Sequence, residues 1–149
     1  MRLRRKILIM DGDADLRTIL ADHIGSHSEF EVAQASNASE AILNLKEFKP
    51  DLVIIDVDLS DMDGREGVQL IRQEGHQGPI IILSAYSMDA VTGLGESPND
   101  YVLKPFKLSV IFARIRYHLR NYDASEAAEL RIGDYVFKPI SKLLIRAAG

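Results

Sequence analysis

Short apolar runs recur along the chain and alternate with segments whose apolar residues follow a helical period. The runs cover residues 5–10, 30–33, 52–57, 79–83 and 100–103. The run at 52–57 is almost continuously apolar, which is typical of a strand covered by helices on both faces. Helical spacing is carried by Leu16, Ile19, Leu20 and Ile24, by Ala41, Ile42, Leu45 and Phe48, by Val68 and Ile71, and by Leu108, Ile111, Phe112, Ile115 and Leu119. This alternation predicts an α/β fold, a doubly wound five-stranded parallel sheet with right-handed crossovers.

Capping residues and helix breakers refine this pattern. Asn37 stands in an N-cap position with Glu40 three residues later, which is the sequence signature of a capping box. Between the fourth and fifth apolar runs, Gly93 and Pro98 oppose a long helix. We therefore expect the connection over residues 85–99 to hold a short or displaced fourth helix.

The C-terminal part of the chain changes character. Residues 122–129 are polar and rich in alanine, and they are predicted to form a linker after a first domain over 1–121. Residues 130–149 are predicted to form two or three short strands, with turns near Gly133 and Pro139. Twenty residues of strand cannot bury a core alone. The segment is therefore expected to begin a second domain or to dock on the first.

Composition narrows the class of protein. The chain has 149 residues, of which 46% are hydrophobic and 27% charged, as expected for one globular domain with a short appendage. Its apolar runs are far too short to span a bilayer, so no membrane association is expected. The absence of cysteine excludes disulfides and thiolate metal sites and fits a cytoplasmic location. The net charge of −4 argues against nucleic-acid binding by this chain itself.

Four polar residues stand at the ends of predicted strands: Asp11, Asp56, Ser84 and Lys104. In a sheet of order 2-1-3-4-5, strands 1 and 3 are neighbours at the point where ligands bind, so Asp11 and Asp56 are expected to face each other. Paired carboxylates favour a hard cation such as Mg²⁺. A phosphoryl group on Asp56 would be stabilised by that metal, by an ion pair with Lys104 and by a hydrogen bond from Ser84.

These residues resemble the receiver domain of two-component response regulators, and the resemblance covers residues 5–120. It implies a flavodoxin-like fold and a signalling protein that catalyses only its own phosphorylation and dephosphorylation. Asp56 would accept a phosphoryl group from a sensor histidine kinase, and Asp11 would be the first of two metal-binding acids. The resemblance also assigns phosphoryl contacts to Ser84 and Lys104, a conformational switch to Ser84 and Tyr101, a cis peptide bond to Lys104–Pro105, and a metal-binding backbone carbonyl to Asp58.

The C-terminal segment narrows the resemblance to the OmpR-type subfamily. Residues 130–139 resemble the opening strands of its winged-helix effector domain. The resemblance implies a homodimer through helix 4, strand 5 and helix 5 that regulates transcription, with Asp100 and Arg114 matching one charge pair between subunits. Val110 replaces the acid of a second pair. Because the recognition helix is missing from these residues, DNA binding is expected only through an effector domain that is absent here.

The sequence departs from the family pattern at Gly12, where the family has its second metal-binding acid. We expect this change to weaken Mg²⁺ binding, with Asp13 as a further candidate ligand and also as the N-cap of the first helix. A second hypothesis is therefore an atypical receiver that acts as a dimerisation or interaction module without phosphorylation. A third hypothesis is a haloacid-dehalogenase-type phosphatase, because residues 56–60 resemble its signature with Asp58 as general acid.

Overall fold

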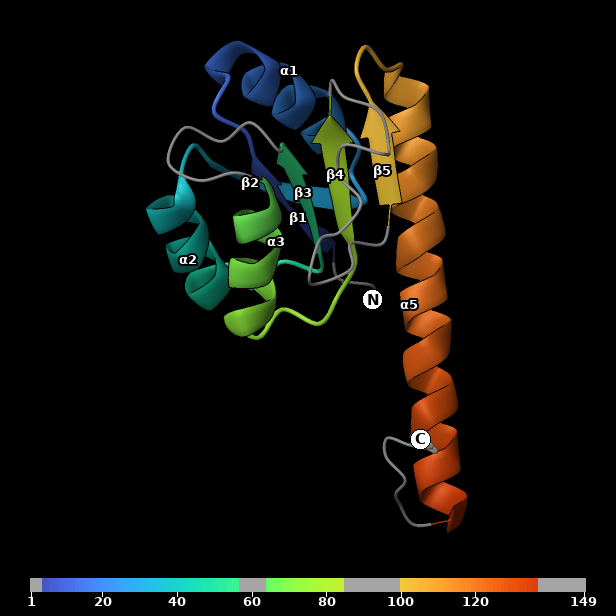
Figure 1. Ribbon diagram of the computed structural model, residues 1–149. Helices are drawn as coiled ribbons and strands as arrows, with labels where there is room; N and C mark the ends of the chain where they lie inside the picture. The colour runs from blue at the N-terminus through green and yellow to red at the C-terminus, as the bar shows by residue number, and fades with distance from the viewer. Residues whose placement is uncertain (1–3, 57–63, 85–99, 137–149) are drawn as a thin grey trace. The chain divides into compact units, whose positions relative to one another are not determined.

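The computed structural model describes residues 4–56, 64–84 and 100–136 of the chain. Five parallel strands form one sheet of order β2-β1-β3-β4-β5 (Figure 1), which confirms the predicted fold class. In chain order the elements are β1 (Arg5–Met10), α1 (Ala14–Gly25), β2 (Phe30–Ala35), α2 (Ala38–Glu47), β3 (Leu52–Asp56), α3 (Gly64–Gln73), β4 (Ile80–Ser84), β5 (Asp100–Leu103) and α5 (Leu108–Val136). The expectation of a short fourth helix falls on residues 85–99, which lie outside the described residues.

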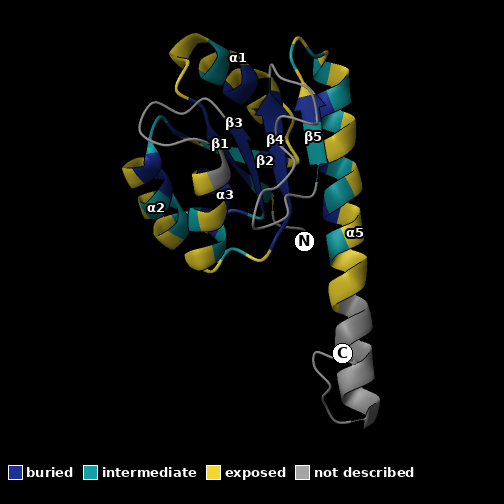
Figure 2. Cartoon of the chain, viewed as in Figure 1, coloured by how far each residue is buried: buried dark blue, intermediate teal, exposed yellow. Residues whose placement is uncertain are grey.

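The sheet lies between two layers of helices, and most of its strand residues are buried. Side chains of one face, among them Met10 and Ile55, form one apolar cluster with Ala41 of α2 and with Val68 and Ile71 of α3. Figure 1 shows α2 and α3 side by side, and Figure 2 shows how completely the strands behind them are buried. Burying one side chain of the size of Ile or Met contributes about 1.5–3 kcal/mol to the free energy of unfolding, so the continuous apolar runs are the main source of stability.

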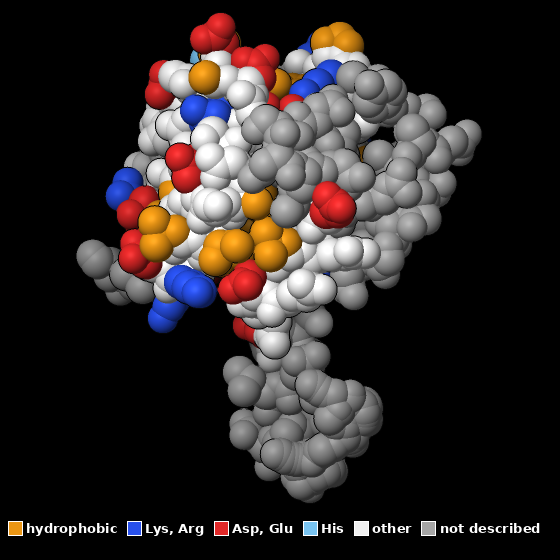
Figure 3. Space-filling view, turned by 60° about the vertical axis from the view of Figure 1, so that its left-hand side comes forward, with side chains coloured by type: hydrophobic (Ala, Val, Ile, Leu, Met, Phe, Trp, Pro, Cys, Tyr) orange, Lys and Arg blue, Asp and Glu red, His pale blue; other side chains and the backbone are white. Residues whose placement is uncertain are grey.

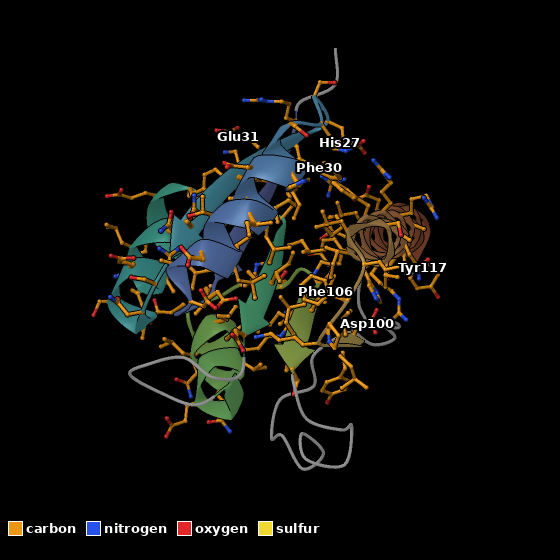
Figure 4. The ribbon with its side chains drawn as sticks, turned by 90° about the horizontal axis from the view of Figure 1, so that it is seen from above. His27, Phe30, Glu31, Asp100, Phe106 and Tyr117 are labelled. Atoms are coloured by element: carbon orange, nitrogen blue, oxygen red, sulfur yellow. The ribbon has the colours of Figure 1, made fainter. Side chains whose placement is uncertain are left out.

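The opposite face of the sheet is closed in part by an aromatic contact. Phe112, near the start of α5, packs against His27 with ring centroids 4.3 Å apart and against Phe30 at 6.5 Å. Figure 4 labels His27 and Phe30, which lie near one another at the end of the molecule where β2 begins. Aromatic pairs at such separations contribute about 0.5–1.5 kcal/mol beyond their buried area. This contact joins the beginning of α5 to the edge strand β2.

Both predicted helix caps are formed. Asp13 Oδ1 accepts hydrogen bonds from the backbone N–H groups of Asp15 at 3.0 Å and Leu16 at 3.2 Å. Asn37 caps α2 by accepting from Glu40 N at 2.9 Å. The Glu40 carboxylate in turn accepts from Ser36 N at 2.8 Å, one residue before the cap. The side chains therefore satisfy N–H groups that the first helical turn leaves without partners.

The prediction for residues 122–136 is wrong. These residues continue α5 without interruption to Val136, where a polar linker and then strands were expected. The physical reason lies in their composition, since residues 124–130 are mostly Ala, Glu and Leu, which have high helix propensity. An existing helix also extends at little cost because each added residue forms one more hydrogen bond. The chain divides into two units, Met1–Ile115 and Arg116–Gly149, and the division falls within α5.

The described surface is mixed in character. Large hydrophobic side chains that are about half exposed include Ile19, Leu43 and Leu103. Figure 3 shows the side of the molecule that carries α2, where apolar atoms are interspersed with acidic and basic ones. No helix of the described residues is both long and apolar enough to cross a membrane.

A close backbone contact fixes the edge of the sheet where β3 and β4 begin. Asp51 N donates to Lys6 O, and Lys6 N donates to Asp51 Oδ2, both at 2.7 Å. The loop before β4 approaches so closely that a Cβ atom on Gly78 would lie 2.3 Å from the carbonyl oxygen of Asp51. Only glycine leaves room for this approach without a backbone shift.

Gly78→Ala is therefore expected to lower the free energy of unfolding by about 1–3 kcal/mol, because the backbone must move to accept the added methyl group. Urea denaturation followed by circular dichroism measures this value. Gly25→Ala is the matched control, since a Cβ there would meet Val32 at an ordinary 3.7 Å. Equal effects of the two substitutions would contradict the explanation from close contact.

Candidate functional site at the carboxyl edge of the sheet

The register of the sheet brings the predicted polar residues together. Met10 of β1 lies opposite Ile55 of β3, so the next residues, Asp11 and Asp56, are neighbours at the carboxyl ends of adjacent strands. Ser84 ends β4, the strand on the other side of β3. Asp11, Asp56 and Ser84 are 0%, 3% and 1% exposed, although all three are polar. Buried polar groups clustered at a strand edge mark a candidate site.

Lys104 reaches into this cluster from the end of β5. Its Nζ donates to Asp56 Oδ2 at 2.8 Å, and the lysine side chain is 22% exposed whereas that of Asp56 is 4% exposed. The backbone of Lys104 is fixed by a 2.7 Å hydrogen bond from its N to Ser84 O, and the Lys104–Pro105 peptide bond is cis. An ammonium group at this position offsets the charge of the buried Asp56 carboxylate.

Asp11 is less completely satisfied than Asp56. Its Oδ1 accepts from Asp13 N at 2.9 Å, whereas its buried Oδ2 has no hydrogen-bond partner among the described residues. Burial raises the pKa of Asp11 to about 6, and the neighbouring Asp56 carboxylate adds to the rise. The Asp13 N–H and the charge of Lys104 oppose this rise in pKa. The positive charge near the Asp11 carboxylate is therefore too small to offset its burial.

This donor set fits a hard divalent cation in part. An unpartnered carboxylate oxygen beside a second carboxylate offers the oxygen ligands that Mg²⁺ binds, with water completing the coordination. Across residues 4–56, 64–84 and 100–136, no three His, Cys, Asp or Glu side chains gather as a metal site. Gly12 has no side chain to give, and Asp13 Oδ1 is engaged as a helix cap. Asp58 lies outside the described residues.

The predicted switch and dimer residues lie on β5 and α5. Tyr101 is half buried and packs against the apolar cluster beneath the site. Arg114 Nη1 donates to both carboxylate oxygens of Asp100, at 2.6 and 2.7 Å, within the same chain. Figure 4 labels Asp100 on this strand. The charge pair that the resemblance places between subunits is therefore closed internally in the single chain.

The sequence pattern does not single out Arg17, which contacts the site from α1. Its Nη1 donates to the backbone oxygen of Asp11 at 2.6 Å, and its Nε donates to Gln34 Oε1 at 3.1 Å. One signal was available, since a cation near the N-terminus of a helix opposes the helix dipole and so suggests a specific partner.

Residues 7–116 of the chain match a known protein family, described as the response regulator receiver domain. The chain belongs to this family. Its position in two-component signalling follows from the family, as does its status as a signalling protein.

Curated relatives are longer than this chain. It is 34% identical over 134 residues to the DNA-binding response regulator MtrA of Mycolicibacterium smegmatis, which covers 89% of this chain and 58% of that protein. It is 39% identical over 122 residues to a protein of Pyropia yezoensis named probable transcriptional regulator ycf27, covering 80% of this chain and 49% of that one. The chain thus spans roughly half to three fifths of these relatives.

Solved receiver structures share the fold. A two-component response regulator from Clostridium difficile is 30% identical with a TM-score of 0.72, over 78% of this chain and 97% of that one. The BeF3-activated N-terminal receiver domain of Klebsiella pneumoniae RstA is 32% identical with a TM-score of 0.67, over 78% and 99%. The five-stranded sheet of order 2-1-3-4-5 is the fold of these receivers.

The electrostatics of Asp11 predict a pH-dependent stability. Because the pKa of Asp11 is raised on folding, the folded state binds the proton more tightly than the unfolded state. The free energy of unfolding of the metal-free protein should therefore fall as pH rises from about 4 through about 6. Asp11→Asn removes this penalty while keeping an oxygen that can accept from Asp13 N. It should stabilise the metal-free protein by roughly 1–3 kcal/mol near pH 7.5, and by less near pH 5.

Urea denaturation in a chelating buffer at both pH values tests this expectation. Asp22→Asn, which removes an exposed acid from α1, serves as the control and should change little. A destabilised Asp11→Asn protein near pH 7.5 would mean that the ionised carboxylate is not strained in the metal-free site.

Proposed function

We propose that this chain accepts a phosphoryl group on Asp56 from a sensor histidine kinase, with Mg²⁺ as cofactor, and thereby switches a dimer that regulates transcription. The observation that carries the proposal is the buried Asp56 carboxylate paired with Lys104 at 2.8 Å, beside an Asp11 oxygen that has no hydrogen-bond partner in the part of the chain that the structure describes. A carboxylate, an ammonium group and an unbalanced second acid are the parts needed to form and hold an aspartyl phosphate.

The residues divide the reaction between them. A carboxylate oxygen of Asp56 attacks the phosphorus of the donor, so that a new P–O bond forms while the bond from phosphorus to the donor breaks. Lys104 Nζ lies where it can pair with the transferred oxygens, and the Ser84 hydroxyl is the further donor on this rim. Bound Mg²⁺ would neutralise part of the phosphoryl charge. Asp11 and Asp56 would hold the metal, and ligation by the Asp58 backbone carbonyl or by Asp13 remains a prediction.

The output of the switch is proposed on the face of β5 and α5, together with the fourth helix that the sequence predicts within residues 85–99. The half-buried Tyr101 is poised between core and solvent, as a switch residue must be. A symmetric dimer would use Asp100 and Arg114, and it would first have to open the pair that they form within each chain. The names of the relatives support regulation of transcription, since MtrA is called a DNA-binding response regulator. DNA binding itself would reside in an effector domain.

The domain limits are part of the proposal. We place the receiver at 1–121, a linking segment at 122–129 and the beginning of a winged-helix domain at 130–149, of which residues 130–136 continue α5. The 134 residues aligned with MtrA outnumber the receiver match at 7–116, which supports a related segment beyond the receiver. The helical state of 122–136 means that the linking segment acts as an extension of α5.

A second candidate function rests on Gly12. A receiver that lacks one metal-binding acid can act as an interaction module that is never phosphorylated, and this is the alternative to test against. The haloacid-dehalogenase reading has no such support, since the chain belongs to the receiver family and the proposed general acid, Asp58, lies outside the described residues.

Treatment with acetyl phosphate and Mg²⁺, followed by intact mass spectrometry, separates these two functions. The wild-type chain should gain one phosphoryl group, and Asp56→Asn should gain none because the nucleophilic carboxylate is gone. Asp15→Asn, which removes an exposed acid from the first turn of α1, should still be modified. If the wild-type chain is not modified, the phosphoacceptor proposal is wrong, and the interaction module remains as the candidate function.

Restoring the missing acid should strengthen the metal site. Among the described residues, positive φ occurs at Lys49 and Gly75, so the backbone of Gly12 does not have the left-handed conformation that favours glycine. Gly12→Asp adds a charge-assisted contact of about 1.5–3 kcal/mol, which lowers the Mg²⁺ concentration needed for half-maximal phosphorylation about ten- to a hundred-fold.

The uncharged variant Gly12→Asn is the matched control, and it should shift the Mg²⁺ dependence much less. If Gly12→Asp and the wild type give the same curve, then Asp13 or water already supplies the missing ligand.

A further inference from the structure

Arg17 contacts the peptide group that precedes the departure from the family pattern. The carbonyl oxygen that accepts from Arg17 Nη1 at 2.6 Å belongs to the peptide bond between Asp11 and Gly12. The same guanidinium group donates through Nε to Gln34 Oε1 on β2 at 3.1 Å. Arg17 therefore connects α1, the end of β1 and the edge strand β2 through two donors in a rigid fork.

The loop that Arg17 contacts needs such a restraint. Glycine has more backbone freedom than any other residue, so Gly12 makes the connection between β1 and α1 costly to order. Two hydrogen bonds restrict the backbone around Gly12, and in both of them an oxygen of Asp11 is the acceptor. Asp13 N donates to Asp11 Oδ1 at 2.9 Å, and Arg17 holds the Asp11 carbonyl. With both bonds made, Asp11 Oδ1 is engaged by Asp13 N, and Oδ2 is the oxygen without a hydrogen-bond partner among the described residues.

We propose that Arg17 is a positioning residue for the metal side of the site, holding the Asp11–Gly12 peptide so that Asp11 Oδ2 stays available beside Asp56. The readout through Mg²⁺ rests on the proposed function, whereas the restraint on the loop exists in the metal-free protein. Arg17 acts through a backbone carbonyl and touches neither the metal nor the phosphoryl group. Arg17 orders this loop at the point where Gly12 replaces the family's second metal-binding acid.

Charge and geometry make opposite predictions for Arg17, which allows a sharp test. If Arg17 affected the site only through its charge, its removal would take a cation away from a cation site and tighten Mg²⁺ binding. If Arg17 positions Asp11, its removal weakens binding, as loss of a group that orients a metal ligand costs about 10- to 100-fold in affinity. The sign of the change identifies the mechanism.

The experiment measures the dissociation constant for Mg²⁺ alone in three variants of the full chain by NMR titration. Arg17→Met removes both donors and the charge, and it should weaken Mg²⁺ binding about tenfold. Arg17→Lys keeps the charge but cannot span Asp11 and Gln34, so it should weaken binding nearly as much. Arg4→Met is the control, since Arg4 is an exposed arginine that precedes β1 at the opposite end of the strand.

A second readout needs no metal. Amide hydrogen exchange in the metal-free protein should be about tenfold faster at Asp13 in Arg17→Met, because the acceptor of its N–H is no longer held in place. Amides in β4, distant from Arg17 in the sheet order, should be unchanged. This pattern separates a local restraint from a general loss of stability, which would accelerate exchange throughout the sheet.

Each outcome decides the proposal. Weaker Mg²⁺ binding in both Arg17 variants, together with faster exchange at Asp13, supports it. Unchanged or tighter binding in Arg17→Met, or unchanged exchange at Asp13, overturns it. If the wild type binds no Mg²⁺, the proposed function fails by itself, and exchange at Asp13 then decides whether Arg17 restrains the loop.

Discussion

Two carboxylates buried at the ends of neighbouring strands set the chemistry of this receiver. Charges in a medium of low polarity interact strongly, and Lys104 pairs with Asp56 while offsetting the charge of Asp11 only in part. Asp11 keeps a raised pKa, and its Oδ2 has no hydrogen-bond partner among the described residues. The metal-free site is thus electrostatically incomplete, and any cation that binds it stabilises the folded state by mass action. The same imbalance that costs stability favours a bound cation at this edge.

The fold maintains this unfavourable arrangement through packing. β3 and β4 are buried along their whole length, and displacing either strand would break its backbone hydrogen bonds to both neighbouring strands and its packing in the core. Asp11 and Asp56 cannot move apart without that loss. The electrostatic strain at this edge costs a few kcal/mol. This cost is small compared with the free energy gained by burying the apolar side chains beneath the site, which is the usual relation between a functional site and its scaffold.

The sequence predicted the features that depend on local period and on chain order. Apolar runs located every described strand, and their ends located Asp11, Asp56, Ser84 and Lys104. It failed where propensity and pattern disagree, since residues 122–136 look like linker and strand by pattern but extend an existing helix. Contacts made by long side chains were also beyond its reach. The bond from Arg17 to the Asp11 carbonyl and the Asp100–Arg114 pair depend on rotamers that spacing does not encode.

Gly12 affects the site in two ways, and both follow from the absence of one carboxylate. One acid fewer beside Asp11 means less repulsion in the metal-free protein, which stabilises the unmodified state. Under the proposed function, one ligand fewer also weakens Mg²⁺ binding, so the phosphorylated state gains less stability. Both effects would bias the equilibrium toward the unmodified form. Under the proposed function, metal binding would depend strongly on the orientation of Asp11, so the hydrogen bonds around Asp11 would matter more than they do beside a complete set of acids.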